Sequence, residues 1–414
     1  MRIRLLSHYL KHLNVIACVF AAFISTLLLI ETAQAQNNRD EFNPLFVDPA
    51  SPDFSKNPDL LVRIKSGPHG YFRFINILFS KEVCRRFEHT LPGTPSFNLH
   101  GDAHIEQYAI TDLGRGLTDF DDSSTGPALL DLMRFGVSLH ITCKVNGWDD
   151  QADELFEKFL LGYRLGINKP KMTAEEPTLV KRIRSKFKFN RKEYLKDIDE
   201  WMQPMPQKEQ TELNEAMQPY VETTLLQHAE LTPAFFEIVK MGLLQMGIGS
   251  ALDIKYLVRL RGKTDDPLDD VVIEIKQVRD LSGIDCITIA QKSDPFRVLV
   301  GQARIAYQPY KYLGYLRFHG QTFWIHAWVD NYKEIDITKS FKSKKELEEV
   351  VLDVGIQLGQ GHPKQIAAPL DIQLRREQLL LLTKYETELA TACAELAELT
   401  VAAWKKFCKN VSHE

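Results

Sequence analysis

The sequence has few cysteines, and no two of them form a C-x-x-C pair. Six cysteines occur in 414 residues, and those beyond residue 35 are Cys84, Cys143, Cys286, Cys393 and Cys408. This spacing offers no zinc-ribbon ligand set and no thioredoxin-type redox motif. An odd number leaves at least one thiol unpaired, so we expect scattered buried thiols with room for one bridge.

An excess of positive charge is also absent. Lys and Arg number 51 against 55 Asp and Glu, which gives a net charge of -4. This balance provides no electrostatic case for nucleic-acid binding, which requires a clustered basic surface. With 44% hydrophobic residues, the chain is long enough for two or three folded lobes.

Long apolar runs are missing except for residues 13–30. Arg2, Arg4 and Lys11 precede this run, and Ala33-Gln34-Ala35 follows it. Basic residues, an apolar run and a small-x-small pattern predict a signal peptide over residues 1–35, with export to the periplasm or the exterior. The run is also just long enough to span a bilayer, so an inner-membrane anchor over residues 13–30 remains the alternative. No other membrane contact is predicted.

Polar and acidic residues gather between residues 100 and 134. His100-Gly101-Asp102-Ala103-His104 follows a strand-like segment, residues 97–99. Two further strand-like segments, residues 108–111 and 117–120, lead to the cluster Asp119-Phe120-Asp121-Asp122, and Gly126-Pro127 then opens an apolar helix. Such groups at strand ends usually converge on a ligand, because loops carry chemistry while the scaffold holds them.

A second group of signals begins at Gly247-Ile248-Gly249-Ser250. The turn leads into two strands, residues 255–260 and 271–278, that a polar turn joins as an antiparallel hairpin. Glycine turns can cover phosphates, although most are only turns. Lys276 stands inside the second strand, where a buried ammonium needs an anionic partner. A helix over residues 295–307 and two more strands complete the order of parts in the small lobe of a protein kinase.

Three blocks resemble a known family. HGDAHIEQY, TDFDD and GPALLDLMR are similar to the GDxHxxN, DFD and GPxxxDLxR blocks of a bacterial family known only as domain of unknown function 2252. That family is distantly similar to aminoglycoside phosphotransferases and other kinase-like enzymes. The resemblance continues at MGIGS and EIKQV and covers most of residues 60–400. It implies phosphoryl transfer from ATP, with Mg²⁺, to a small-molecule acceptor.

The resemblance also assigns roles to residues. It implies catalytic roles for Asp102 as the base and for His100 and His104 beside it. Metal ligands would be Asp119, Asp121 and Gln107, and the nucleotide phosphates would contact Gly247, Gly249, Ser250 and Lys276. Two positions depart from the pattern, because Gln107 stands for the expected Asn and Val300 for the acidic helix residue that pairs with the lysine.

The order of the two halves is reversed relative to a kinase, because the loop at Asp102 precedes the glycine turn. The resemblance therefore implies an α+β, kinase-like, two-lobe fold that is circularly permuted. Its segments would be the signal peptide 1–35, an extended arm 36–59, the catalytic-loop part of a helical lobe 60–165, a helical insertion 166–234, a small β lobe 235–330, and C-terminal helices 331–414.

Two other classes of function fit the same residues. His100, Asp102, His104, Asp119 and Asp121 could instead supply zinc, manganese or iron to a metal-dependent hydrolase. A degenerate, non-catalytic binding protein would keep the fold without turnover. The permuted-kinase hypothesis makes one geometric demand, that Lys276 lie within a few ångströms of Asp119. The sequence gives no signal for the acceptor or the oligomeric state.

Overall fold

The computed structural model describes residues 43–54, 57–246, 248 and 253–411. The chain divides into two units, residues 1–46 and 47–414, and every element below belongs to the second unit. The predicted signal peptide and the glycine-turn residues Gly247, Gly249 and Ser250 lie outside the described residues. Among the helices that are described, none has the length and apolar character needed to cross a membrane.

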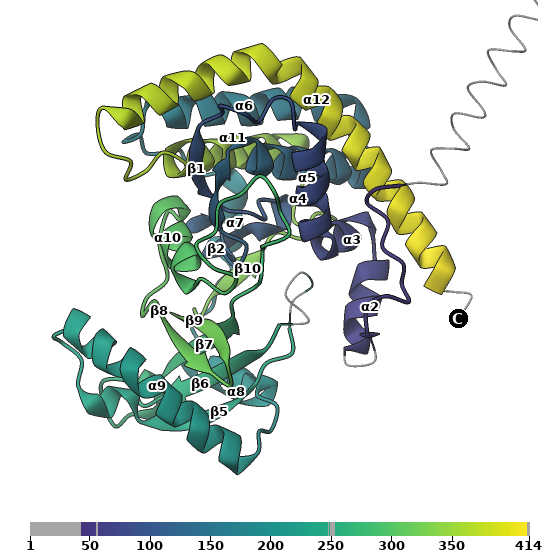
Figure 1. Cartoon of the computed structure of the whole chain (residues 1–414). Coiled ribbons are helices and arrows are strands. Elements are labelled where there is room, and N and C mark those ends of the chain that lie inside the picture. The colour runs from purple at the N-terminus through teal and green to yellow at the C-terminus, as the bar shows by residue number, and fades with distance from the viewer. Residues whose placement is uncertain (1–42, 55–56, 247, 249–252, 412–414) are drawn as a thin grey trace, which may run out of the picture. The chain divides into compact units, whose positions relative to one another are not determined.

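Helices and strands are mixed along the chain (Figure 1), which confirms the predicted α+β class. The helices are α2 (Pro58–Lys65), α3 (Pro68–Phe74), α4 (Asn76–Arg86), α5 (Leu129–Asn146), α6 (Ala152–Asn168), α7 (Thr178–Arg184), α8 (Arg191–Trp201), α9 (Gln207–Gln227), α10 (Pro295–Ile305), α11 (Lys344–Gly361) and α12 (Leu370–Val411). The strands are β1 (Ser96–Leu99), β2 (Tyr108–Thr111), β3 (Arg115–Leu117), β4 (Ser124–Pro127), β5 (Ile238–Leu243), β6 (Lys255–Leu260), β7 (Val271–Gln277), β8 (Gly314–Phe318), β9 (Gln321–Ala327) and β10 (Tyr332–Glu334).

A five-stranded antiparallel sheet has the order β5-β6-β7-β9-β8. The predicted hairpin is its centre, and β6 pairs with β7 so that Lys255 lies opposite Lys276. Alternation along β7 gives the sheet two unlike faces. Ile273 and Ile275 join the apolar cluster beneath α9, whereas Glu274 and Lys276 point to the other face. There α8 covers part of the sheet through Leu195 and its neighbours, so the segment predicted as a helical insertion packs on the sheet.

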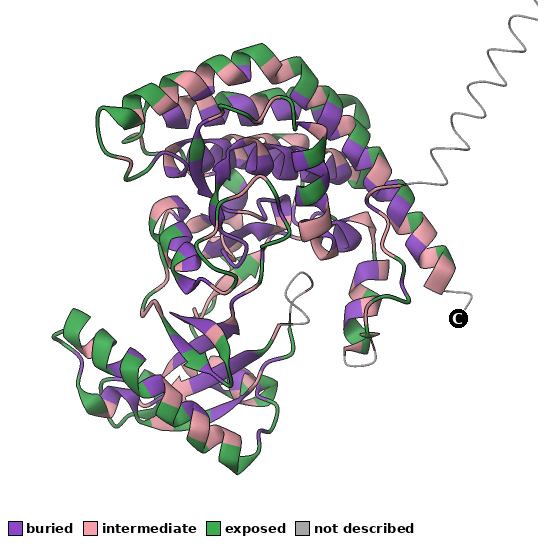
Figure 2. Cartoon of the chain, viewed as in Figure 1, coloured by how far each residue is buried: buried purple, intermediate pink, exposed green. Residues whose placement is uncertain are grey.

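The larger helical part is built around α6 and α11, which are buried along most of their facing sides (Figure 2). The two helices approach so closely that glycine is required where they cross. A Cβ atom added at Gly162 would lie 2.3 Å from the carbonyl oxygen of Leu352, and one added at Gly355 would lie 2.2 Å from that of Phe159. Backbone therefore packs against backbone in this crossing.

Gly355→Ala is expected to lower the free energy of unfolding by about 1–3 kcal/mol, because the added methyl group overpacks a rigid contact between two backbones. The higher helix propensity of alanine offsets only part of this cost. Urea unfolding would measure it. Gly67→Ala is the matched control, because nothing lies within 4 Å of a Cβ atom there; equal stabilities for the two variants would contradict the packing argument.

Two small sheets carry the polar stretch. β1 pairs antiparallel with β4, and β2 pairs with both β3 and β10 in the order β10-β2-β3. The predicted strands at residues 97–99 and 108–111 are confirmed, while the strand expected over residues 117–120 ends earlier, at Leu117. One disulfide joins Cys84 on α4 to Cys286 in the loop before α10, and Cys143 and Cys393 are buried thiols.

Candidate functional site

The side chain of Lys276 lies between two aspartates of the polar stretch. Its Nζ is 2.7 Å from Oδ1 of Asp119, across 157 residues of sequence, and it also forms an ion pair with Asp121. Lys276 is on β7, whereas the aspartates follow β3. The predicted proximity of Lys276 to Asp119 is therefore met. Val300, where an acidic partner was expected from the helix, lies on α10 and is partly exposed; the partners of Lys276 come from the loop instead.

Burial and the close approach of charged groups shift the pKa values of the side chains in this cluster. Burial alone would lower the pKa of Lys276, but Asp119 and Asp121 outweigh it and raise the pKa. Burial would likewise raise the pKa of Asp119, but the Lys276 ammonium outweighs it and lowers the pKa. For Asp121, burial and then the nearby Asp119 charge raise the pKa to about 8. Two carboxylates therefore share one ammonium, and Asp121 is the one that keeps a proton.

Asp121→Asn is expected to stabilise the metal-free protein increasingly as pH rises from about 5 to about 8. The folded-state pKa of Asp121 lies above its unfolded value near 4. The folded state therefore binds a proton that the unfolded state has released, and stability falls with rising pH through this window. The asparagine cannot titrate and can still accept from Trp324, whose Nε1 lies 2.9 Å from Asp121 Oδ1. Melting temperatures of the wild type and of Asp121→Asn, measured with a chelator across this pH range, test the expectation. A difference in melting temperature that does not change with pH would contradict it.

Asp102 is held by a buried arginine. Nε and Nη2 of Arg134, on α5, lie 2.9 and 2.8 Å from Asp102 Oδ1. The same guanidinium lies over the ring of Phe72, 3.7 Å from its centroid. Burial alone would raise the pKa of Asp102, but the Arg134 charge outweighs it and lowers the pKa. The carboxylate therefore stays ionised and fixed in orientation.

The loop that carries Asp102 is fixed through its backbone. Asp131, on α5, accepts from the backbone N–H groups of His100 and Gly101 at 2.7 and 2.8 Å. Gly101 has φ +82°, and a Cβ atom there would lie 1.9 Å from the carbonyl oxygen of Asp122. Only glycine fits a left-handed position this close to another backbone. The backbone of the HGD loop therefore packs directly against the backbone of the acidic cluster.

The two predicted catalytic histidines face inward. His100 donates from Nε2 to the carbonyl of Thr118 at 2.9 Å and accepts at Nδ1 from the backbone N–H of Asp102 at 3.2 Å. Within the part of the chain that the structure describes, His104 has no hydrogen-bond partner at either ring nitrogen, and its Nε2 is 3.6 Å from Asp102 Oδ2. Burial, opposed by Asp102, lowers the pKa of His104 to about 4. His100 therefore shapes the loop, and His104 stands neutral behind Asp102.

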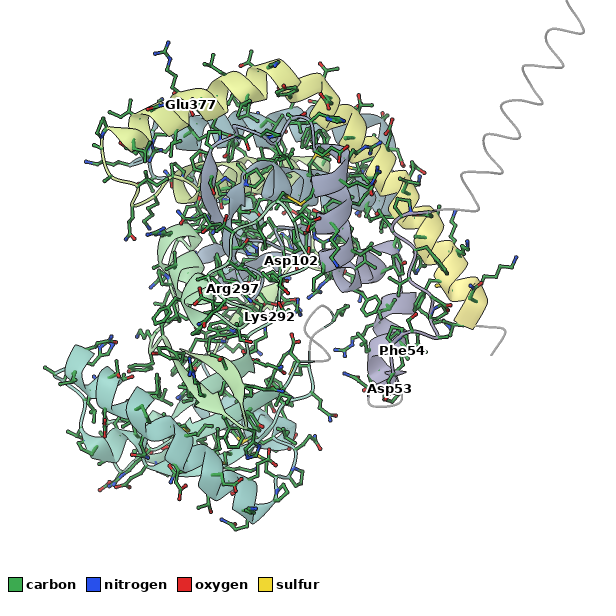
Figure 3. The ribbon with its side chains drawn as sticks, in the orientation of Figure 1. Asp53, Phe54, Asp102, Lys292, Arg297 and Glu377 are labelled. Carbon is green, nitrogen blue, oxygen red and sulfur yellow. A yellow bond between two sulfur atoms is a disulfide. The ribbon has the colours of Figure 1, made fainter. Side chains whose placement is uncertain are left out.

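A layer of arginines holds the acidic cluster from the sheet side. Arg279 contacts Asp122 through Nη1, 2.8 Å from Oδ2, and Asn76 donates to the same oxygen at 2.9 Å. Arg297, on α10, donates to the carbonyl oxygens of Asp121 and Ser123, and Figure 3 labels it with Asp102. Sheet, helix α10 and acidic loop are therefore linked by buried charge.

One cavity of about 690 Å³ connects these groups. Its lining includes the predicted residues Asp102, Gln107, Asp119, Asp121 and Lys276. Lys255 and Glu274 line it from the sheet, and burial, followed by the Lys276 charge, lowers the pKa of Lys255 to about 8. The cavity thus brings two lysines of the sheet together with carboxylates of the sheet and of the acidic loop.

The structure brings together most of the predicted site. His100 does not line the cavity, and His104 lies outside its lining as well. Within the described residues, no three His, Cys, Asp or Glu side chains are placed to hold a metal ion together. Sequence reasoning missed the roles of Arg134, Asp131 and Arg279. The first two stand in the DLxR block, which was the available signal; Arg279 had none.

The chain matches a known family of proteins over most of its length. A family model described as "Uncharacterized protein conserved in bacteria (DUF2252)" matches residues 60–193 and 180–410. No curated protein matches the chain, and neither does any solved structure.

Proposed function

We propose that this chain, which belongs to that family of uncharacterised bacterial proteins, is a kinase-like phosphotransferase that uses Mg²⁺ and a nucleotide to phosphorylate a small molecule. The observation that carries the proposal is the contact of Lys276 with Asp119, 2.7 Å long. In kinase-like enzymes a strand lysine contacts nucleotide phosphates and an aspartate two short strands after the catalytic loop binds the metal. Here both groups line the cavity that Asp102 also lines.

The arrangement of elements supports a kinase-like fold of two lobes whose order in the chain is circularly permuted. The five-stranded sheet supplies Lys276, and the loops that follow β1 and β3, in the part of the chain that carries the two small sheets, supply Asp102 and Asp119. The aspartates precede the lysine in the chain, the reverse of the kinase order, yet all three meet at one cavity. We infer that circular permutation has kept the site while changing the chain order.

The donor set suits magnesium. Asp119 and Asp121 are adjacent carboxylates, one of them with a raised pKa, so a divalent cation would relieve their repulsion. Gln107 Oε1 is a buried acceptor with no hydrogen-bond partner among the described residues, while its Nε2 lies 3.4 Å from Asp102. These three side chains would hold the ion, which when bound would supply positive charge against the negative charge of the phosphates.

The remaining chemistry rests on the chain's own residues. Lys276 would contact the phosphates once it leaves Asp121. Asp102 would orient the acceptor hydroxyl and receive its proton. Because Arg134 lowers the pKa of Asp102, Asp102 is a weak base, and its main contribution is orientation, as expected where bond breaking to the leaving group runs ahead of attack.

A thermal-shift assay tests the proposal. ATP with Mg²⁺ is expected to raise the melting temperature of the wild-type protein by mass action. Asp119→Ala is expected to abolish the rise, and His104→Ala, which alters a buried ring outside the cavity lining, is expected to keep it. A shift with zinc or manganese alone would favour the hydrolase alternative, and no response to nucleotide or metal would favour a binding protein without turnover.

A further inference from the structure

One end of the cavity is aromatic. Trp201 ends α8 and Trp328 follows β9; their ring centroids are 6.3 Å apart at 63°. Tyr194, also on α8, donates from its hydroxyl to the carbonyl oxygen of Trp328 at 3.3 Å. All three line the cavity with Leu244. Trp201 is 39% exposed, although a tryptophan of a soluble protein is mostly covered.

This aromatic end lies in line with Lys276. The backbone N–H of Trp328 donates to the carbonyl oxygen of Val272 at 2.8 Å, so Trp328 sits beside the start of β7. Lys276 is four residues further along the same strand, which is about 13 Å at about 3.3 Å per residue. A ligand that reaches both ends has a flat ring at one end and an anion at the other.

Acidic side chains share α8 with Tyr194 and Trp201. Glu193 and Asp197 line the cavity from α8, and carboxylates accept hydrogen bonds from sugar hydroxyls. Flat rings gain most from contact with aromatic faces. The cavity therefore offers aromatic rings and carboxylates on α8 and, about 13 Å further along β7, the Lys276 ammonium, which suit the base, sugar and phosphate of a nucleotide.

We propose that Trp201, Trp328 and Tyr194 form the subsite for the purine base of the nucleotide, with Trp201 as the principal stacking wall. The inference rests on the proposed function and deepens it by naming the residues that bind the base. Tyr194 and Trp201 come from α8, which lies in the chain between the catalytic loop and the five-stranded sheet. Specificity at this subsite comes from stacking, so it accepts a purine nucleoside without phosphate.

The test uses adenosine as the probe, measured by calorimetry and by quenching of tryptophan fluorescence. Wild-type protein is expected to bind adenosine without Mg²⁺, and Trp201→Ala is expected to weaken this binding about five- to one-hundredfold. Phe189→Ala is the matched control, since Phe189 is 75% exposed but does not line the cavity; it is expected to bind as the wild type. Trp201→Phe keeps a ring and is expected to recover most of the affinity.

The outcomes separate this inference from the proposed function. If Trp201→Ala binds adenosine as tightly as the wild type, or the wild type binds none, the base subsite is wrong, even where Mg–ATP still raises the melting temperature. If adenosine binds and Trp201→Ala loses it, the subsite stands, even where the protein shows no Mg²⁺-dependent response to ATP and the phosphotransferase proposal fails.

Discussion

Lys276→Met is expected to abolish Mg²⁺-dependent nucleotide binding and to destabilise the fold. The ammonium supplies the phosphate contact of the proposed site, and it also compensates Asp119 and Asp121 in the buried cluster. Removing one partner from a buried charge cluster typically costs about 3–5 kcal/mol, and because Asp121 already keeps a proton, Asp119 is the carboxylate that loses its counter-charge. Calorimetric titration would measure binding, and urea unfolding would measure stability.

Lys333→Met is the matched control for this prediction. Lys333 also lines the cavity but is exposed on β10, so its replacement is expected to change stability by less than about 0.5 kcal/mol. If Lys276→Met and Lys333→Met behaved alike in both assays, the ion cluster would not have the energetic role assigned to it.

Asp102→Asn is expected to slow turnover far more than it weakens nucleotide binding. Orientation of the acceptor hydroxyl is the main contribution of Asp102, and general-base assistance, which contributes about 10²- to 10⁴-fold in favourable cases, adds to it; an amide of the same shape neither takes the proton nor orients the hydroxyl as a carboxylate does. Because the acceptor is unidentified, the rate measured is basal nucleotide hydrolysis with water as acceptor. The nucleotide dissociation constant is expected to stay within about threefold of wild type, since Asp102 contacts Arg134 rather than phosphate.

The control for Asp102 is Glu106→Gln. Glu106 also lines the cavity, but its carboxylate is held by His69 and Arg73, each at 3.2 Å, so only a modest change in rate is expected. A loss of nucleotide binding in Asp102→Asn as large as its loss of rate would contradict the assignment of Asp102 to the acceptor side.

Local patterns were sufficient to predict the hairpin of β6 and β7, whereas the meeting of Lys276 with Asp119 was expected from the resemblance to kinase-like enzymes. Alternation identified β6 and β7, and the cost of burying Lys276 required an anionic partner somewhere in the chain. The resemblance to kinase-like enzymes pointed to Asp119 of the DFD cluster as the neighbour of Lys276. Periodicity and charge predicted the strand and the need for an anion, and the resemblance indicated which anion.

Long-range side-chain pairings could not be predicted in the same way. Nothing near Asp131 indicates that its carboxylate turns to the backbone of His100, and nothing near Cys84 selects Cys286 among the other cysteines. The position of α8 over the sheet was also missed, because an amphipathic helix shows which face is buried but not against what. Trp201 therefore became visible as a candidate only in the folded chain.

Calorimetric titration with Mg²⁺ and a non-hydrolysable ATP analogue, applied to the wild type, Asp119→Asn, Lys276→Met and the double variant, tests most directly that these residues form one nucleotide site. Interacting residues give non-additive effects. We expect tight Mg²⁺-dependent binding by the wild type, loss in each single variant, and little further loss in the double variant. No binding by the wild type, or losses that add fully, would contradict a shared site.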